Sequence, residues 1–457
     1  MSSFDEIQNR EAGLHKKLSA KQMGMIAIGG AIGTGLFMGS KFAISFAGPA
    51  VIVSYAIGGL IAFALMACLA EMTVQHPTSG SFGAYAEHYI SPLAGFLVRY
   101  CYWACIVLAV GTEITAVADY MKLWFPNVDS WVWIGFFSLT LLVVNAYSVK
   151  AFGLVEYWFS TIKVFAIIVF ILLSIGILTQ SNQGMTQVVT HLSGYGGFFP
   201  NGFSGLFYML AFLMFAFGGI ELIGMAAAEA KDPKKTIPKA INQVVFRILI
   251  FYIGSLAILL SLVPWNQLDL GGLDKSPFVM IFSQMGIVWA AHLLNFIILT
   301  AALSVYNSGM FANSRMLYGL AQQGNAPKIF KKVNKQGVPV PAVLLSALLI
   351  FGCVLLNYFV PEDALSHLMY IVVGALVLNW AMISMTHLKF KSAMKKLGQK
   401  THFPALWAPF SNYLVLGFIA VVLYIMWSQG FKESVMMIPI WIVLMFILFK
   451  VLNAKEQ

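Results

Sequence analysis

Runs of about 20 apolar residues recur along the whole of this chain, and they constrain its fold more than any other feature. As an α-helix, each run is long enough to cross a hydrocarbon core about 30 Å thick. The chain is 60% hydrophobic and only 10% charged, whereas soluble domains carry roughly 25% charged residues. The alternating pattern of a membrane β-barrel is not evident. The sequence therefore predicts an all-α integral membrane protein.

We count twelve spans, and their expected centres lie near residues 31, 60, 109, 140, 167, 215, 254, 297, 348, 375, 416 and 442. Three connections are rich in lysine and contain Lys231, Lys234, Lys235, Lys239, Lys328, Lys331, Lys332, Lys335, Lys389, Lys391, Lys395, Lys396 and Lys400. Short basic connections stay in the cytoplasm. We therefore expect these connections and both termini to be cytoplasmic.

The first span carries an unusual cluster of glycines, in the stretch "AIGGAIGTGLFMG" over residues 27–39. Each glycine inside a helix costs roughly 0.5–1 kcal/mol relative to alanine. Tight packing of small residues against another helix is one explanation. However, Gly30, Gly33, Thr34 and Gly35 do not share a face, which favours an unwound segment.

A second cluster, "FAFGGIELIGMAAAEAKDP" over residues 215–233, lies in the sixth span, five spans after the first. In transporters built from inverted repeats, interrupted helices at matching places mark the substrate site. An unwound segment suits a zwitterion, because free N–H groups face a carboxylate and free carbonyls face an ammonium. We therefore predict a cytoplasmic segment over 1–22, five-helix repeats over 23–180 and 200–388, and two further helices over 404–453.

Several long segments resemble the bacterial amino acid permeases of the amino acid–polyamine–organocation superfamily. They are "GGAIGTGLF", "FGGIELIGMAAAEAKDPKKTIPKAINQV", "RILIFYIGSL", "LTAALSVYNS" and "NSRMLYGLAQQGNAPK". Within this family the chain looks most like the permeases for aromatic amino acids and for phenylalanine. The resemblance implies a leucine-transporter-type fold, with helices 1 and 6 interrupted, and proton-coupled uptake of amino acids.

The resemblance also implies a set of substrate-binding residues at the two breaks. It places the substrate carboxylate on the backbone of Gly33, Thr34 and Gly35. It places the amino group near the carbonyls of Ala31 and Ile32 and of the sixth-helix break, which comprises Phe215, Ala216, Phe217 and Gly218. Phe215 occupies the position of an aromatic gate in related transporters. The alternative for Phe215 is an ordinary core position.

Ionisable side chains within the spans are costly and are therefore functional candidates. Glu113 could carry a proton, contact the substrate ammonium or fix its helix. Lys163, about two turns from the cytoplasmic end, matches by resemblance a lysine that replaces sodium in proton-coupled relatives, or it snorkels to the surface. Glu221 could capture the proton or tie down the broken helix. Glu71, Glu156 and Glu229 are expected to make structural contacts with residues such as Arg99 or Lys231.

The predicted function is import of amino acids, most closely phenylalanine, tyrosine and tryptophan, by proton symport through alternating access. Permeases for histidine, proline or another neutral amino acid share the backbone motifs, and sodium coupling or exchange remains an alternative. The net charge of +10 is explained by juxtamembrane lysines that face membrane lipid, so no nucleic-acid partner is expected. Scattered histidines and the lack of a phosphate-binding loop argue against an enzyme and against direct ATP drive.

We expect no cofactor besides the coupling proton, no metal, and no obligate protein partner. A channel is the other transport class with glycine-rich breaks. One unrepeated filter-like segment in a twelve-span chain disfavours this class. The expected location is the bacterial cytoplasmic (inner) membrane.

Overall fold

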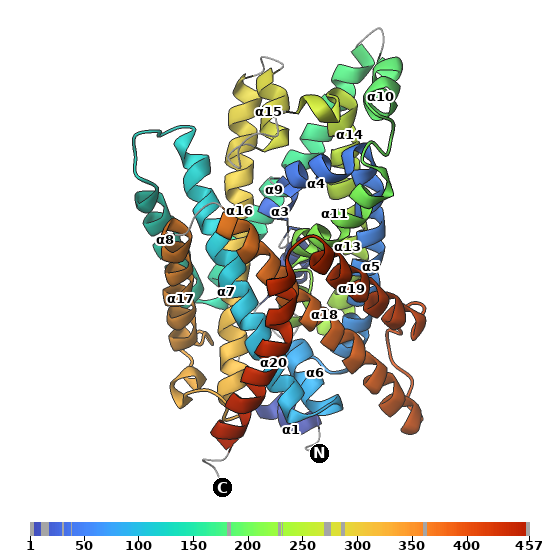
Figure 1. Ribbon diagram of the computed structural model, residues 1–457. Helices are drawn as coiled ribbons and strands as arrows, with labels where there is room; N and C mark the ends of the chain where they lie inside the picture. Colours follow the sequence, from blue (N-terminus) through green and yellow to red (C-terminus); the bar gives the residue numbers. More distant parts are fainter. Residues whose placement is uncertain are drawn as a thin grey trace.

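The computed structural model describes residues 4–10, 18–29, 32–37, 39–180, 184–226, 230, 232–268, 276–284, 288–359 and 363–453. Within these ranges the chain is helical apart from turns, bends and an isolated bridge between Leu18 and Ala230. The predicted all-α fold is therefore confirmed. The chain forms a bundle in which both marked chain ends lie at the lower end, whereas α10 and α15 lie at the upper end (Figure 1).

The first part of the chain contains the helices that precede residue 200. They are α1 (Phe4–Arg10), α2 (Ala20–Gly29), α3 (Thr34–Phe37), α4 (Gly39–Ala47), α5 (Val51–Gln75), α6 (Ser81–Tyr89), α7 (Pro92–Lys122), α8 (Ser130–Tyr147), α9 (Val149–Gln180) and α10 (Gly184–Ser193).

The second part begins with α11 (Gly202–Phe217) and ends with α20. Between them lie α12 (Leu222–Ala226), α13 (Pro233–Arg247), the π-helix η3 (Ile248–Gly254), α14 (Ser255–Leu262), α15 (Pro277–Gln284), α16 (Val288–Gln322), α17 (Val340–Phe359), α18 (Asp363–Lys396) and α19 (Phe410–Ser428), and α20 covers Lys432–Asn453.

Ten helical stretches among the described residues are long and apolar enough to cross a membrane. One of them, Gly35–Gln75, runs through two predicted spans, because a short 3-10 turn over Gly48–Ala50 joins α4 directly to α5. The helix at Val340–Leu355 is apolar but shorter. Every predicted centre except residue 31, which lies outside the described residues, falls within a helix. The count of twelve spans thus stays a prediction.

The long helices α7 and α16 pack along each other through the middle of the bundle (Figure 1). Gly309 lies at their interface, where an added Cβ would come within 2.2 Å of Val110 Cγ2 and 3.1 Å of Ile106 Cγ2. Small residues let helix backbones approach closely in a membrane, where no hydrophobic effect drives helices together. The two interrupted helices pack beside this pair, since α3 and α12 both contact α16.

A buried carboxylate, Glu71, joins three segments near the lower end of the bundle. Its Oε2 lies 2.8 Å from His387 Nε2 and accepts a hydrogen bond from the Ala405 N–H at 2.8 Å. Its Oε1 accepts hydrogen bonds from Lys391 Nζ at 2.9 Å and from Thr401 Oγ1 at 2.5 Å. The expected contact with Arg99 is wrong for this glutamate. Glu229 and Lys231 lie outside the described residues.

Arg99 instead pairs with Glu87 of α6, at 2.9 Å. The sequence missed this pair because α6 returns along the base of α7, which no local pattern predicts. Glu71 therefore joins segments that lie far apart in the sequence, whereas the pair of Glu87 and Arg99 joins two consecutive helices.

We expect the substitution Glu71→Ala to destabilise the protein by about 3–5 kcal/mol, because it leaves buried donors, one of them charged, without their acceptor. Thermal unfolding in detergent, followed by size-exclusion chromatography, measures the effect. Asp129→Asn is the control, since Asp129 is exposed and its side chain makes no capping hydrogen bond. Equal unfolding temperatures for the two variants would contradict this role of Glu71.

Helix α1 docks at the lower end through Phe4, which lies against a cluster of aromatic rings. The centroid of the Phe4 ring is 4.1 Å from that of His76, 5.4 Å from that of His88 and 5.9 Å from that of Tyr85. His76 Nε2 also lies 2.7 Å from the hydroxyl of Tyr89. Burial, reinforced by the neighbouring His88, lowers the pKa of His76 from 6.5 to about 4.

Docking of α1 should therefore weaken in acid. Because the folded pKa of His76 is depressed, undocked protein binds the extra proton more readily as the pH falls from about 6.5 towards 4. We expect faster hydrogen exchange of the α1 amides at pH 4.5 than at pH 7, after correction for the intrinsic rate. His76→Gln should remove this difference. Equal α1 protection in the wild-type protein at both pH values would refute the mechanism.

Candidate functional site

The first interruption lies between α2, which ends at Gly29, and α3, which begins at Thr34. Ile32 and Gly33 between them are not helical. The Gly33 carbonyl accepts the N–H groups of Leu36 at 3.2 Å and Phe37 at 3.4 Å, so the new helix starts there. The predicted break is confirmed, although Ala31 lies outside the described residues and the side chain of Thr34 is not described.

The second interruption lies between α11, which ends at Phe217, and α12, which begins at Leu222. Gly219 in this turn has a φ of +90°, which favours glycine because a side chain would be strained there. The buried Glu221 bonds back to the break, since its Oε1 accepts the Gly219 N–H at 3.2 Å. This geometry is that of a carboxylate that ties down a broken helix.

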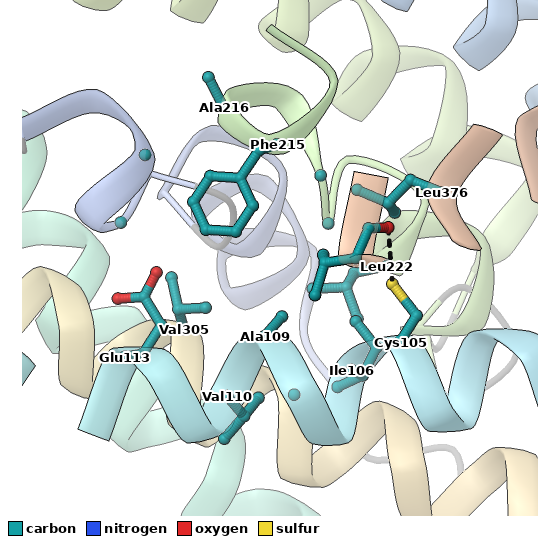
Figure 2. Close-up of a pocket in the computed structure, with 16 residues that line it drawn as sticks. Cys105, Ile106, Ala109, Val110, Glu113, Phe215, Ala216, Leu222, Val305 and Leu376 are labelled. Carbon is teal, nitrogen blue, oxygen red and sulfur yellow. Dashed lines mark hydrogen bonds between the residues drawn. The ribbon is translucent and has the colours of Figure 1, made fainter. Parts of the chain in front are cut away.

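A small cavity lies between the two breaks and α7. It encloses about 50 Å³ and is lined by Gly33, Gly35, Cys105, Ile106, Ala109, Val110, Glu113, Phe215, Ala216, Gly218, Gly219, Leu222, Val305, Gly309, Val372 and Leu376. Figure 2 shows the Phe215 ring over the cavity, above the α7 helix that carries Ala109 and Glu113. An apolar cavity of roughly 150 Å³ holds benzene. An aromatic side chain therefore enters only if a wall residue moves.

Most of the predicted binding residues line this cavity, but Ile32 and Phe217 do not. Gly33, Gly35, Phe215, Ala216 and Gly218 do so. Ile32 is buried and offers its carbonyl to a lysine. Phe217 is buried and packs its ring against Tyr55 and Tyr252.

Phe215 is half-buried and its ring borders the cavity. The ring also packs against the hydrophobic core, so this position suits either an aromatic gate or a core residue. Its nearest ring neighbour is Phe212 on the same helix, at a centroid distance of 6.0 Å. Such a ring can turn away from the cavity without breaking a hydrogen bond.

Glu113 of α7 faces the first break from below (Figure 2). It is 4% exposed. A Cβ built on Gly33 would lie 3.0 Å from Glu113 Oε1 and 2.5 Å from Val305 Cγ2. Gly33 is required by this close approach, because any side chain would displace the carboxylate from the backbone of the break.

Lys163 lies deeper in α9 than the sequence suggested. It is 14 residues after the start of the helix at Val149, which is about four turns rather than two. Its side chain is fully buried, so it does not snorkel to the surface. Its Nζ donates to the carbonyl of Ile32 at 3.0 Å and to Ser304 Oγ at 2.8 Å. Lys163 therefore binds the broken helix rather than the cavity.

The sequence did not single out the residues of the apolar wall. These come from α7, α12, α16 and α18 and include Ile106, Ala109, Val110, Leu222, Val372 and Leu376. They are ordinary apolar residues in apolar helices, so only their position distinguishes them. The described residues contain no group of three His, Cys, Asp or Glu side chains that could hold a metal ion.

Comparison with known proteins gives the same family as the sequence motifs. Residues 22–452 match the family model described as amino acid permease. The aromatic amino acid transport protein AroP of Escherichia coli K12 is 49% identical over 445 residues, covering 97% of both chains. An uncharacterized amino acid permease of Bacillus subtilis, YtnA, is 40% identical over 447 residues, covering 96% of this chain and 95% of that protein.

Among solved structures, a manganese transporter of Eremococcus coleocola aligns with a TM-score of 0.59 at 12% identity, covering 95% of this chain and 94% of that one. A likeness at this identity shows the fold alone, which is the leucine-transporter type with its first and sixth helices interrupted. The family assignment rests on the sequence matches. The chain belongs to the amino acid permease family of multi-pass bacterial membrane transporters.

Proposed function

We propose that this permease imports aromatic amino acids together with protons, and that the lower end of the bundle faces the cytoplasm. The observation that carries the proposal is the apolar cavity between two helix breaks, with backbone polar groups and one carboxylate on its rim. The AroP proteins, at 49% identity, support the aromatic substrate. The lysine-rich connections support the orientation.

The breaks supply charge complementarity for the ends of an amino acid. The first N–H groups of α3 have no partner within the helix, and they attract a carboxylate. The carbonyls proposed for the ammonium already accept hydrogen bonds, Ile32 from Lys163 and Ala216 from Tyr252 at 3.1 Å. A carbonyl has a second lone pair, but the Glu113 carboxyl group, beside Gly33, can both accept hydrogen bonds from an ammonium and pair with it. We therefore assign the ammonium chiefly to Glu113.

The side chain of the substrate is assigned to the apolar wall formed by α7, α12 and α18. Because the cavity of about 50 Å³ is too small for a ring, binding has to displace a wall residue, and Phe215 is the one free to turn. Closure of Phe215 over the bound ring would exclude water from the upper side. Alternating access follows when the two broken helices tilt relative to α9 and α16.

The proton supplies the drive for accumulation. One charge that moves across 100 mV is worth about 2.3 kcal/mol, which corresponds to roughly fifty-fold accumulation. The side chain of Lys163 donates to the Ile32 carbonyl, and by resemblance this lysine stands where sodium-coupled relatives bind sodium. This arrangement favours proton coupling over sodium coupling.

The decisive experiment is uptake of labelled phenylalanine into proteoliposomes, with an imposed inward proton gradient and no sodium. We expect gradient-driven uptake that unlabelled tyrosine and tryptophan suppress most strongly among the twenty amino acids. Strongest competition by histidine, proline or an aliphatic amino acid would overturn the aromatic assignment. Uptake that ignores the proton gradient would overturn the coupling.

The close approach at Gly33 yields a second test. We expect Gly33→Ala to lower phenylalanine uptake at least ten-fold, because the new methyl group meets Val305 and Glu113. Gly352→Ala is the matched control, since no heavy atom lies within 4 Å of a Cβ built at that position on α17. Protein amount and unfolding temperature are measured for both. A Gly33→Ala protein that transports at the wild-type rate would show that the approach is not needed.

A further inference from the structure

Helix α9 carries a second buried charge besides Lys163. Glu156 precedes Lys163 by seven residues, which is about two helical turns, so both side chains lie on the same face. Both residues are fully buried. The sequence suggested only structural contacts near a helix end for Glu156. The structure instead places this carboxylate inside the bundle, among polar side chains of its neighbours.

The Ser304 hydroxyl connects the two charges across the interface with α16. It accepts a hydrogen bond from Lys163 Nζ at 2.8 Å and donates one to Glu156 Oε1. A hydroxyl that accepts from an ammonium and donates to a carboxylate is oriented by both charges. The charges of Lys163 and Glu156 thus offset each other through a single side chain.

Further polar groups hold the carboxylate in place. Ser160 Oγ donates to Oε1 at 3.3 Å and Asn307 Nδ2 donates to Oε2 at 3.0 Å. Asn145 of α8 in turn donates from its Nδ2 to Asn307 Oδ1 at 2.8 Å. Glu156 is therefore fixed by α8, α9 and α16, the helices on which the broken helix would have to move.

On the side of Lys163 that faces α16, the neighbouring carboxylate is that of Glu156. Among the described residues of α9 and of the elements packed on it (α2, α8, α10, α14, α16 and η3), Glu156 is the only Asp or Glu. Their other ionisable residues are Lys21, Tyr147, Lys150, Tyr157, His191, Tyr252, His292, Tyr306, Arg315 and Tyr318.

Of these residues, Arg315 stacks on the Phe311 ring at 3.7 Å. The opposite side of Lys163 faces the first break. There Glu113 of α7 approaches Gly33, next to the Ile32 carbonyl that Lys163 binds.

We propose that Glu156 is a positioning residue that keeps Lys163 protonated, through Ser304, and thereby sets the pH range in which the lysine holds the first helix break. The inference rests on the proton coupling proposed above. A protonated Lys163 donates to the Ile32 carbonyl and stabilises the break in its present place. Loss of that proton leaves the Glu156 charge buried without its partner, so the carboxylate opposes deprotonation until the helices rearrange.

The test is the pH profile of phenylalanine uptake at a constant membrane potential, for wild type, Glu156→Gln and Ser160→Ala. Glutamine keeps the shape and removes the charge. We expect its half-maximal uptake to move at least about one pH unit towards acid, because opposite charges this close shift protonation by that much or more. The KM for phenylalanine at acidic pH should stay within about two-fold of the wild-type value.

Ser160→Ala is the matched control. It removes a hydrogen bond to the same oxygen, Glu156 Oε1, but leaves the carboxylate charge and the contact between Ser304 and Lys163. We expect the Ser160→Ala profile to superimpose on that of the wild-type protein. An equal acid shift in this variant would mean that packing, not charge, moves the profile, and would overturn the proposal.

Ser304 gives an independent pair of variants if Glu156→Gln does not fold. Ser304→Ala removes the bridging hydroxyl, and we expect an acid shift of the same direction. Ser304→Thr keeps a hydroxyl and should restore the wild-type profile. Identical profiles for alanine and threonine would overturn the role of the bridge.

The outcomes separate this inference from the proposed function. If wild-type uptake ignores the proton gradient, the coupling fails and the inference fails with it. If wild-type uptake is proton-driven but Glu156→Gln changes only the maximal rate, proton symport stands and the inference about Glu156 alone is wrong.

Discussion

The structure is organised around the need to satisfy backbone groups at two helix breaks within the membrane. In hydrocarbon each unpaired N–H or C=O costs several kcal/mol, so irregular backbone persists only where protein or a polar ligand meets it. Side chains from other helices perform this task here. Lys163 binds the Ile32 carbonyl, Tyr252 binds the Ala216 carbonyl and Glu221 accepts the Gly219 N–H. A bound substrate can form hydrogen bonds with the backbone groups at the breaks that these side chains do not bind.

This constraint explains the positions of four buried ionisable residues. Lys163 and Glu221 each bond to a break directly, and Glu113 faces Gly33 at the edge of the cavity. Glu156 is one step further away and acts on the break only through Ser304 and Lys163. Charged groups are expensive within a membrane, and in this protein they offset the cost of irregular backbone and of each other. Under the proposed function, substrate binding and proton coupling would use one network of side chains.

The cavity in this conformation is too small for an aromatic ring. Its volume of about 50 Å³ is well below the roughly 150 Å³ that holds a benzene ring. The Phe215 ring lies over it (Figure 2). In the proposed transport cycle, the substrate, Phe215 and the first break move together. The hydrogen bonds of Lys163 with the Ile32 carbonyl and with Ser304 link that movement to α9 and α16.

The sequence by itself determined the membrane-spanning helical fold, the two interruptions and the family. These follow from local properties: the length of apolar runs, glycine clusters and long contiguous motifs. Gly33, Gly35, Phe215 and Glu113 were identified from sequence and do meet at one cavity. The tertiary structure alone decided that Lys163 binds Ile32, that Glu156 pairs with it through Ser304, and that Glu71 joins α5 to the segment around Thr401. These contacts join residues more than a hundred positions apart, so their geometry depends on how the helices pack, which no local pattern encodes.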